Sequence, residues 1–191
     1  MTSTLSQEMN TDQFWKIIDS VHAKSGGGMD RKCELLKKEL SALEKDDLCD
    51  FIDQFDAADS AAYTWPLWGA AYVMHGGCSD DSFSDFRATL ISQGQRVYEL
   101  ALADPESLIE LDFDDEEDVC YEGFQYVKND VAEEKLDEIP KRKAAFPDDP
   151  TGSEWDEDSV EQLYPKLAAK YSGGAESADS PPTDKPWWKF W

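Results

Sequence analysis

The residue types best suited to chemistry gather in residues 75–85 of this 191-residue chain. Cys78 comes directly before residues 79–81, a Ser-Asp-Asp run that predicts the start of a helix, where the helix dipole lowers the pKa of a thiol. His75 lies three residues earlier and can act as the base for a Cys78 nucleophile. The alternative is structural, because two glycines at 76–77 suit a tight corner between helices and a cysteine can fill that corner as a small buried side chain. We favour the corner.

A second candidate for chemistry is a set of carboxylates at the start of the same predicted helix. Asp81 and Asp85 are four residues apart and therefore share a helical face, with Asp80 beside them. Such carboxylates can hold a hard cation such as Mg²⁺ together with water. In the alternative interpretation, which we favour, they are surface acids stabilised by the helix dipole. We expect no cofactor.

The charge of the chain restricts its partners. Forty-two acidic residues against 18 basic ones give a formal net charge of -24, which repels nucleic acid and anionic lipid and favours a basic protein partner. Nine acids and no base occur in residues 104–118, and seven acids and no base occur in residues 148–161. Five members of the first run are candidate partner-binding residues: Asp112, Asp114, Asp115, Glu116 and Glu117.

The C-terminus predicts a second element that binds a partner. Residues 172–186 are rich in Gly, Ser, Asp and Pro and predict a flexible linker. Four aromatic residues follow it: Trp187, Trp188, Phe190 and Trp191. Exposed aromatic clusters typically insert into a groove of a partner, so we favour a docking tip. Two alternatives are that the tip folds back onto its own domain or that it lies at a membrane interface.

The cysteines and the termini predict a cytoplasmic protein. The four cysteines are dispersed, without a C-x-x-C pair, which is typical of buried thiols in a reducing compartment. The chain shows neither a signal peptide nor an apolar run long enough to span a membrane.

Apolar residues recur with helical spacing through most of the chain, which predicts an all-α fold. We expect a compact bundle of about six to eight helices over residues 11–171, after a disordered N-terminus at 1–10 and before the flexible tail. Residues 65–74 are apolar almost all round and predict a buried helix, so Trp65, Trp68 and Tyr72 are expected in the core rather than in a pocket. Arg87 is expected to pair with a neighbouring acid.

Three stretches of this part of the chain carry a family resemblance. They read W-x-L-W-G-A-A-Y at 65–72, G-G-C-S-D-D at 76–81 and F-R-x-x-L-I-x-Q-G at 86–94. The chain resembles a bacterial family of domains of unknown function over residues 11–133. The resemblance implies a helical fold and no particular activity.

Three functions remain open on these observations. The favoured one is a non-enzymatic, acidic protein-binding module that neutralises or adapts a basic partner. The second is an enzyme that uses Cys78 with His75, or a metal held by Asp80, Asp81 and Asp85. The third is a mimic of nucleic acid, which requires the two acidic runs to form one continuous surface.

Overall fold

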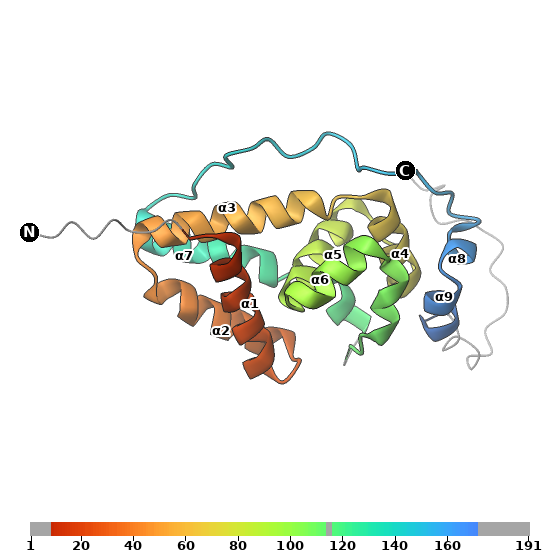
Figure 1. The fold of residues 1–191 in the computed structure, drawn as a ribbon, viewed down its shortest axis with the longest axis horizontal. Coiled ribbons are helices and arrows are strands. Elements are labelled where there is room, and N and C mark those ends of the chain that lie inside the picture. The colour runs from red at the N-terminus through yellow and green to blue at the C-terminus, as the bar shows by residue number, and fades with distance from the viewer. Residues whose placement is uncertain (1–8, 114–115, 172–191) are drawn as a thin grey trace, which may run out of the picture.

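The computed structural model describes residues 9–113 and 116–171, and in these residues every regular element is a helix (Figure 1). The α-helices are α1 (Thr11–Ser25), α2 (Met29–Ala42), α3 (Lys45–Ala61), α4 (Trp65–His75), α5 (Asp80–Ser92), α6 (Gln95–Ala103), α7 (Val127–Leu136), α8 (Val160–Leu163) and α9 (Pro165–Tyr171). Three 3₁₀ helices lie between α6 and α7: η1 (Pro105–Glu110), η2 (Glu116–Cys120) and η3 (Phe124–Tyr126). The all-α prediction is confirmed.

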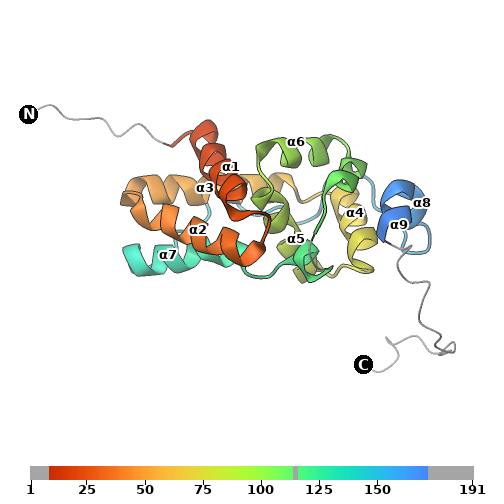
Figure 2. The ribbon, with the colours of Figure 1, turned by 90° about the horizontal axis from the view of Figure 1, so that it is seen from below.

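Helices α1, α2, α3 and α7 gather at one end of the elongated molecule, and α4, α5, α6, α8 and α9 at the other (Figure 2). Helix α1 is capped by Asn10. The Asn10 side chain accepts from the Gln13 amide at 3.0 Å, and the Gln13 side chain accepts from the Asn10 amide at 2.9 Å. Met9 is buried in the core, so the fold includes the last residues of the segment expected to be disordered.

Helix α4 is the buried apolar helix that the sequence predicts. Leu67, Ala70 and Met74 are buried in the core, while Trp65 and Trp68 are half-buried and stack on each other with ring centroids 5.3 Å apart. Trp68 also stacks on Phe83 of α5, at 4.9 Å. Trp68 and Tyr72 therefore pack against the core as expected, whereas Trp65 lies outside it and contacts Trp68 and Trp155.

Helical structure is interrupted at two places in the second half of the chain. The first lies at residues 121–123, which separate η2 from η3, and α7 begins only at Val127. A Cβ atom at Gly123 would lie 2.6 Å from the Tyr121 ring, so this turn requires glycine. The second lies between α8 and α9, because Pro165 cannot continue a helix from α8.

A long segment without helix, residues 137–159, runs back over the molecule from the end of α7 to α8 (Figure 1). Thr151 pairs with the connection between α3 and α4: its amide donates to Tyr63 O at 3.1 Å, and its carbonyl accepts from the Trp65 amide at 2.8 Å. The Trp155 indole donates to Trp65 O at 2.9 Å. This covering segment therefore crosses α3 before it reaches α4.

No helix in the part of the chain that the structure describes is both long enough and apolar enough to cross a membrane.

Candidate functional site

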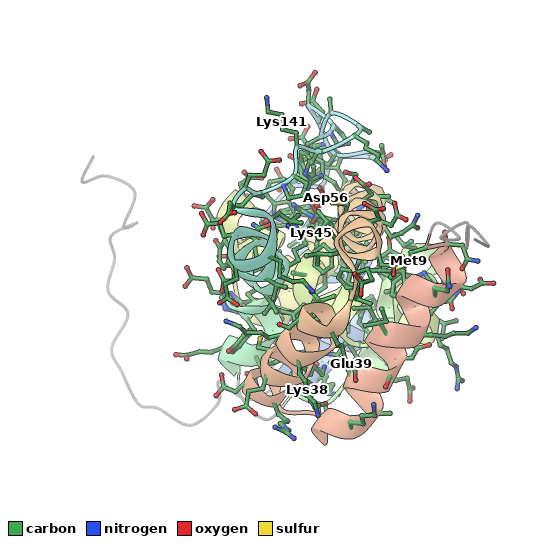
Figure 3. The ribbon with its side chains drawn as sticks, turned by 90° about the vertical axis from the view of Figure 1, so that its left-hand side faces the viewer. Met9, Lys38, Glu39, Lys45, Asp56 and Lys141 are labelled. Carbon is green, nitrogen blue, oxygen red and sulfur yellow. The ribbon has the colours of Figure 1, made fainter. Side chains whose placement is uncertain are left out.

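A buried group of charged side chains joins four parts of the fold. Asp56 and Asp59 lie one turn apart on α3 and therefore share a face of that helix. Arg87 reaches them from α5, Lys128 from α7 and Arg142 from the covering segment. In Figure 3, Asp56 lies where α3 and α7 run side by side, below the segment that carries Lys141.

Each oxygen of the two carboxylates lies near a basic side chain. The Arg87 Nε donates to Asp59 Oδ1 at 2.9 Å, and the Lys128 Nζ lies 3.1 Å from Asp56 Oδ1. Arg142 contacts the other oxygen of each carboxylate, with Nη2 2.6 Å from Asp59 Oδ2 and Nε 3.6 Å from Asp56 Oδ2. Because both aspartates are more than nine-tenths buried, these contacts act with little screening by water.

Aromatic rings surround the two guanidinium groups. The Arg87 guanidinium carbon lies 4.8 Å from the Phe83 ring centroid and 5.0 Å from that of Tyr63. Phe146 of the covering segment contacts both arginines, at 5.3 Å from Arg87 and 4.9 Å from Arg142. The buried Arg87 Nη1 has no hydrogen-bond partner among the described residues, whereas the guanidinium group as a whole makes cation–π contacts with these rings.

Two hollows open beside this charged group. The larger, which we call the acidic hollow, has a volume of about 610 Å³ and is lined by Asp59, Tyr63, Asp80, Asp81, Ser84, Arg87, Gln125, Arg142, Phe146, Pro147 and Asp148. The smaller has a volume of about 240 Å³, and its lining includes Asp56, Asp59, Lys128 and Arg142. Asp80, Asp81 and Asp148 are exposed, so carboxylates in contact with water line the acidic hollow above the buried ion pairs.

Comparison with protein-family models assigns the chain. Residues 9–134 match the model of a family described as protein of unknown function (DUF4240), which is more than half of the chain. The protein belongs to the DUF4240 family. Neither the curated proteins nor the solved structures give a match.

The match divides the candidate site into two parts. Asp56, Asp59, Arg87 and Lys128 lie within the DUF4240 region, whereas Arg142 belongs to the covering segment beyond it. Asp80 and Asp81 also come from the DUF4240 region, and Phe146 and Asp148 do not. The acidic hollow is thus completed by residues that follow the family domain.

The carboxylates predicted as metal ligands do not form a common site. Asp80 and Asp81 line the acidic hollow, but Asp85 accepts a hydrogen bond from the Gln125 Nε2 at 2.5 Å and is not part of that lining. Burial raises the pKa of Asp85. Within the described ranges, no three His, Cys, Asp or Glu side chains lie close enough to hold a metal ion.

The surroundings of Cys78 do not favour the activated thiol that was considered as the alternative to a helix corner. The pKa of Cys78 is raised, first because the thiol hydrogen-bonds with that of Cys120 and second because of burial. The Nδ1–H of His75 donates to Gly77 O at 2.8 Å. The Trp68 indole donates to Cys78 O at 2.9 Å, which supports the alternative in which this stretch is a packed helix corner.

The predicted partner-binding acids are only partly described. Asp112 is paired with Lys170 at 2.7 Å, although its own side chain is 91% exposed. Glu117 is exposed and lines a separate hollow of about 530 Å³ that also includes His75 and Tyr121. The remaining candidates lie outside the described residues or side chains: Asp114, Asp115, the side chain of Glu116, Trp187, Trp188, Phe190 and Trp191.

The two aspartates at the centre of the site could not be singled out from the sequence. Asp56 and Asp59 are two of 42 acidic residues, and their spacing on a helix is common in such a chain. The available signal was the apolar stripe of α3, because Phe55 is buried and both aspartates lie within four residues of it. The expected pairing of Arg87 with an acid is confirmed by its contact with Asp59.

Proposed function

We propose that this DUF4240 protein is a non-enzymatic binding module that holds a basic protein partner at the acidic hollow. The observation that carries the proposal is the combination of exposed carboxylates with aromatic rings in one hollow, formed by Asp80, Asp81 and Asp148 with Tyr63 and Phe146. Carboxylates bind ammonium and guanidinium groups, and ring faces attract the same cations. The hollow therefore suits a cationic side chain.

The net charge of -24 supports the same partner class. A strongly acidic surface raises the rate of encounter with a cationic protein and weakens as salt is added. The acidic hollow offers one specific binding site for such a partner, because four aspartates and two arginines line it together. We infer that long-range charge steers the partner and the hollow fixes its position.

The contacts of Cys78 and His75 give less support to an enzyme. A nucleophilic cysteine needs a lowered pKa and a nearby base, whereas the pKa of Cys78 is raised and His75 donates to a backbone carbonyl.

A nucleic-acid mimic is also less well supported. Its continuous acidic surface is interrupted where Lys166 and Lys170 of α9 contact Glu106 and Asp112.

The test is the binding of labelled octalysine and octaarginine to the full chain, followed by fluorescence anisotropy at increasing salt. We compare the protein with the triple variant Asp80→Asn/Asp81→Asn/Asp148→Asn. A matched control removes three exposed charges elsewhere, as Asp46→Asn/Glu133→Gln/Glu138→Gln. The proposal predicts that the hollow variant loses at least about tenfold in affinity, equivalent to 1.4 kcal/mol, and that the control loses much less.

Equal losses in the two triple variants would show that net charge alone attracts the peptide, which contradicts the proposal. Circular dichroism checks that both variants fold, because Asp80 and Asp81 also stabilise the first turn of α5. A further variant that ends at Pro186 removes the proposed docking tip, Trp187–Trp191. We propose that the tip adds an apolar anchor, so this deletion should weaken binding to a basic protein more than binding to octalysine.

A further inference from the structure

The two buried aspartates contact basic residues from two parts of the chain, the family domain and the covering segment. Lys128 and Arg87, both within the DUF4240 region, contact the Oδ1 atoms of Asp56 and Asp59. The Oδ2 atoms of the same two aspartates both face Arg142. Without Arg142, the family domain would therefore present two carboxylate oxygens toward the covering segment.

The contacts of Arg142 use the whole guanidinium group. Its Nη2 lies 2.6 Å from Asp59 Oδ2, its Nε lies 3.6 Å from Asp56 Oδ2, and its Nη1 donates to Ser60 Oγ at 3.0 Å. The guanidinium group of Arg142 also lies over the Phe146 ring, with its carbon 4.9 Å from the ring centroid. A planar fork of donors spans these separate acceptors, whereas the compact ammonium of a lysine cannot reach all three.

We propose that Asp56, Asp59 and Ser60 form a guanidinium socket, that Arg142 is its internal occupant, and that an arginine of the basic partner can replace it. This inference rests on the proposed function and specifies which side chain the partner inserts. Two features of Arg142 allow the exchange. Its side chain is 33% exposed, compared with 10–11% for the two carboxylates beneath it. It also lines both the acidic hollow and the smaller one, so space is available on either side of it.

When one guanidinium group replaces another, the buried carboxylates keep the same ion-pair and hydrogen-bond contacts. Removal of Arg142 alone leaves their Oδ2 atoms without a charged partner, which is costly in a buried site. An arriving arginine restores these contacts while Arg142 moves into water. Because the internal arginine competes at a high effective concentration, a partner should bind more tightly to a chain that lacks the Arg142 side chain.

The test is chemical rescue of Arg142→Ala in the full chain. We expect the substitution to lower the melting temperature and ethylguanidinium at low millimolar concentration to restore part of the loss. Ethylammonium should restore less, because it cannot span the three acceptors. The matched control is Lys143→Ala, which removes a neighbouring cation that contacts Asp53 and is 73% exposed; ethylguanidinium should not raise its melting temperature.

The socket is refuted if ethylguanidinium and ethylammonium shift the melting temperature of Arg142→Ala equally, or if neither shifts it more than in the unsubstituted protein. If Arg142→Ala does not fold, Arg142→Lys keeps the charge and provides the same comparison. In addition, octaarginine should bind either variant at least about tenfold more tightly than it binds the unsubstituted chain, whereas octalysine should gain less. Equal gains for the two peptides would also contradict the inference.

The outcomes separate this inference from the proposed function. Absence of rescue together with loss of peptide binding in the triple hollow variant would reject the socket and leave the acidic hollow as the binding site. Rescue by ethylguanidinium together with equal losses in the two triple variants would establish the socket and reject the wider hollow as the place where the partner binds.

Discussion

Lys32 is a charged residue of α2 whose side chain is completely buried. Its Nζ donates to Ser92 Oγ at 3.2 Å, and burial lowers its pKa from 10.5 to about 8, against the opposing effect of Asp118. His22 is nearby, and its pKa is lowered by burial and then by the charge of Lys32. The unfolded chain therefore holds the lysine proton more tightly than the folded protein does, so this group makes stability increase as the pH rises from about 8 to 10.5.

We predict that Lys32→Met stabilises the protein at neutral pH by about 1–3 kcal/mol, because an apolar side chain avoids the cost of burying the ammonium. The gain should shrink above pH 8, since the lysine of the unsubstituted protein becomes neutral there. Urea unfolding at several pH values measures both effects. A gain that is independent of pH would show that packing, rather than charge, is responsible.

We also predict that Cys78 reacts slowly with iodoacetamide near neutral pH. Its raised pKa keeps the thiol protonated, and only the thiolate attacks the reagent. Mass spectrometry of the Cys78 peptide should show labelling at least about tenfold slower in the folded chain than in urea. Faster labelling in the folded chain would instead support the nucleophile hypothesis.

At the scale of elements, α4 depends on a glycine that faces the covering segment and α8–α9. A Cβ atom added to Gly69 would lie 2.8 Å from Tyr164 Cε2 and 3.0 Å from Trp155 Cδ1. The Tyr164 hydroxyl is held by Pro66 O at 2.8 Å, so its ring cannot move away freely. Alanine is usually better than glycine inside a helix, but here the close approach reverses that preference.

Gly69→Ala should therefore destabilise the protein by about 1–3 kcal/mol, measured by chemical denaturation. Combining it with Tyr164→Ala tests the cause, because loss of the ring removes the closest contact, whereas the contact with Trp155 at 3.0 Å remains. In that background, Gly69→Ala should cost less than it does in the unsubstituted protein. If the substitution costs the same in both backgrounds, contact with Tyr164 is not the reason for the glycine.

The buried ion pairs connect α3, α5, α7 and the covering segment, so they should contribute strongly to stability. Asp59→Asn leaves Arg87 without a carboxylate and removes the shorter of the two carboxylate contacts of Arg142, and we expect it to cost about 3–5 kcal/mol. On the same helix, Asp53 contacts the exposed Lys143, and Asp53→Asn should cost less than about 1 kcal/mol. Comparable costs for the two substitutions would contradict the role given to the buried pairs.

The bounds of α1 to α6 could largely be predicted from the sequence, because each helix has an apolar stripe and a terminal signal such as Ser79 or Gly76. The 3₁₀ helices could not, since the break before α7 depends on Tyr121 packing against Gly123. The covering segment was also beyond prediction, because its path is fixed by tertiary contacts such as Thr151 with Tyr63 rather than by periodicity.

The candidate site was predicted only in its outer part. Asp80 and Asp81 were identified as functional candidates, but as metal ligands together with Asp85, which instead pairs with Gln125. Arg142 appeared in the sequence as one of three consecutive basic residues. Its contact with aspartates more than 80 positions earlier in the chain could not be inferred from a local pattern.

At the scale of the whole molecule, the acidity is organised rather than uniform. Basic residues of α9 contact part of the 104–118 run, and Lys143 contacts acids of α3. At the acidic hollow, by contrast, exposed carboxylates gather around aromatic rings and two arginines. We therefore propose that a basic partner is recognised at this one place and is steered there by the charge of the whole molecule.

The most direct test of that claim is a titration of the ¹⁵N-labelled full chain with octaarginine, followed by NMR at about physiological ionic strength. The account predicts that the largest amide shifts occur at the lining of the acidic hollow, including Asp80, Phe146 and Asp148, and that they saturate together. Shifts spread evenly over the acidic residues of the described surface, without saturation at the hollow, would contradict it.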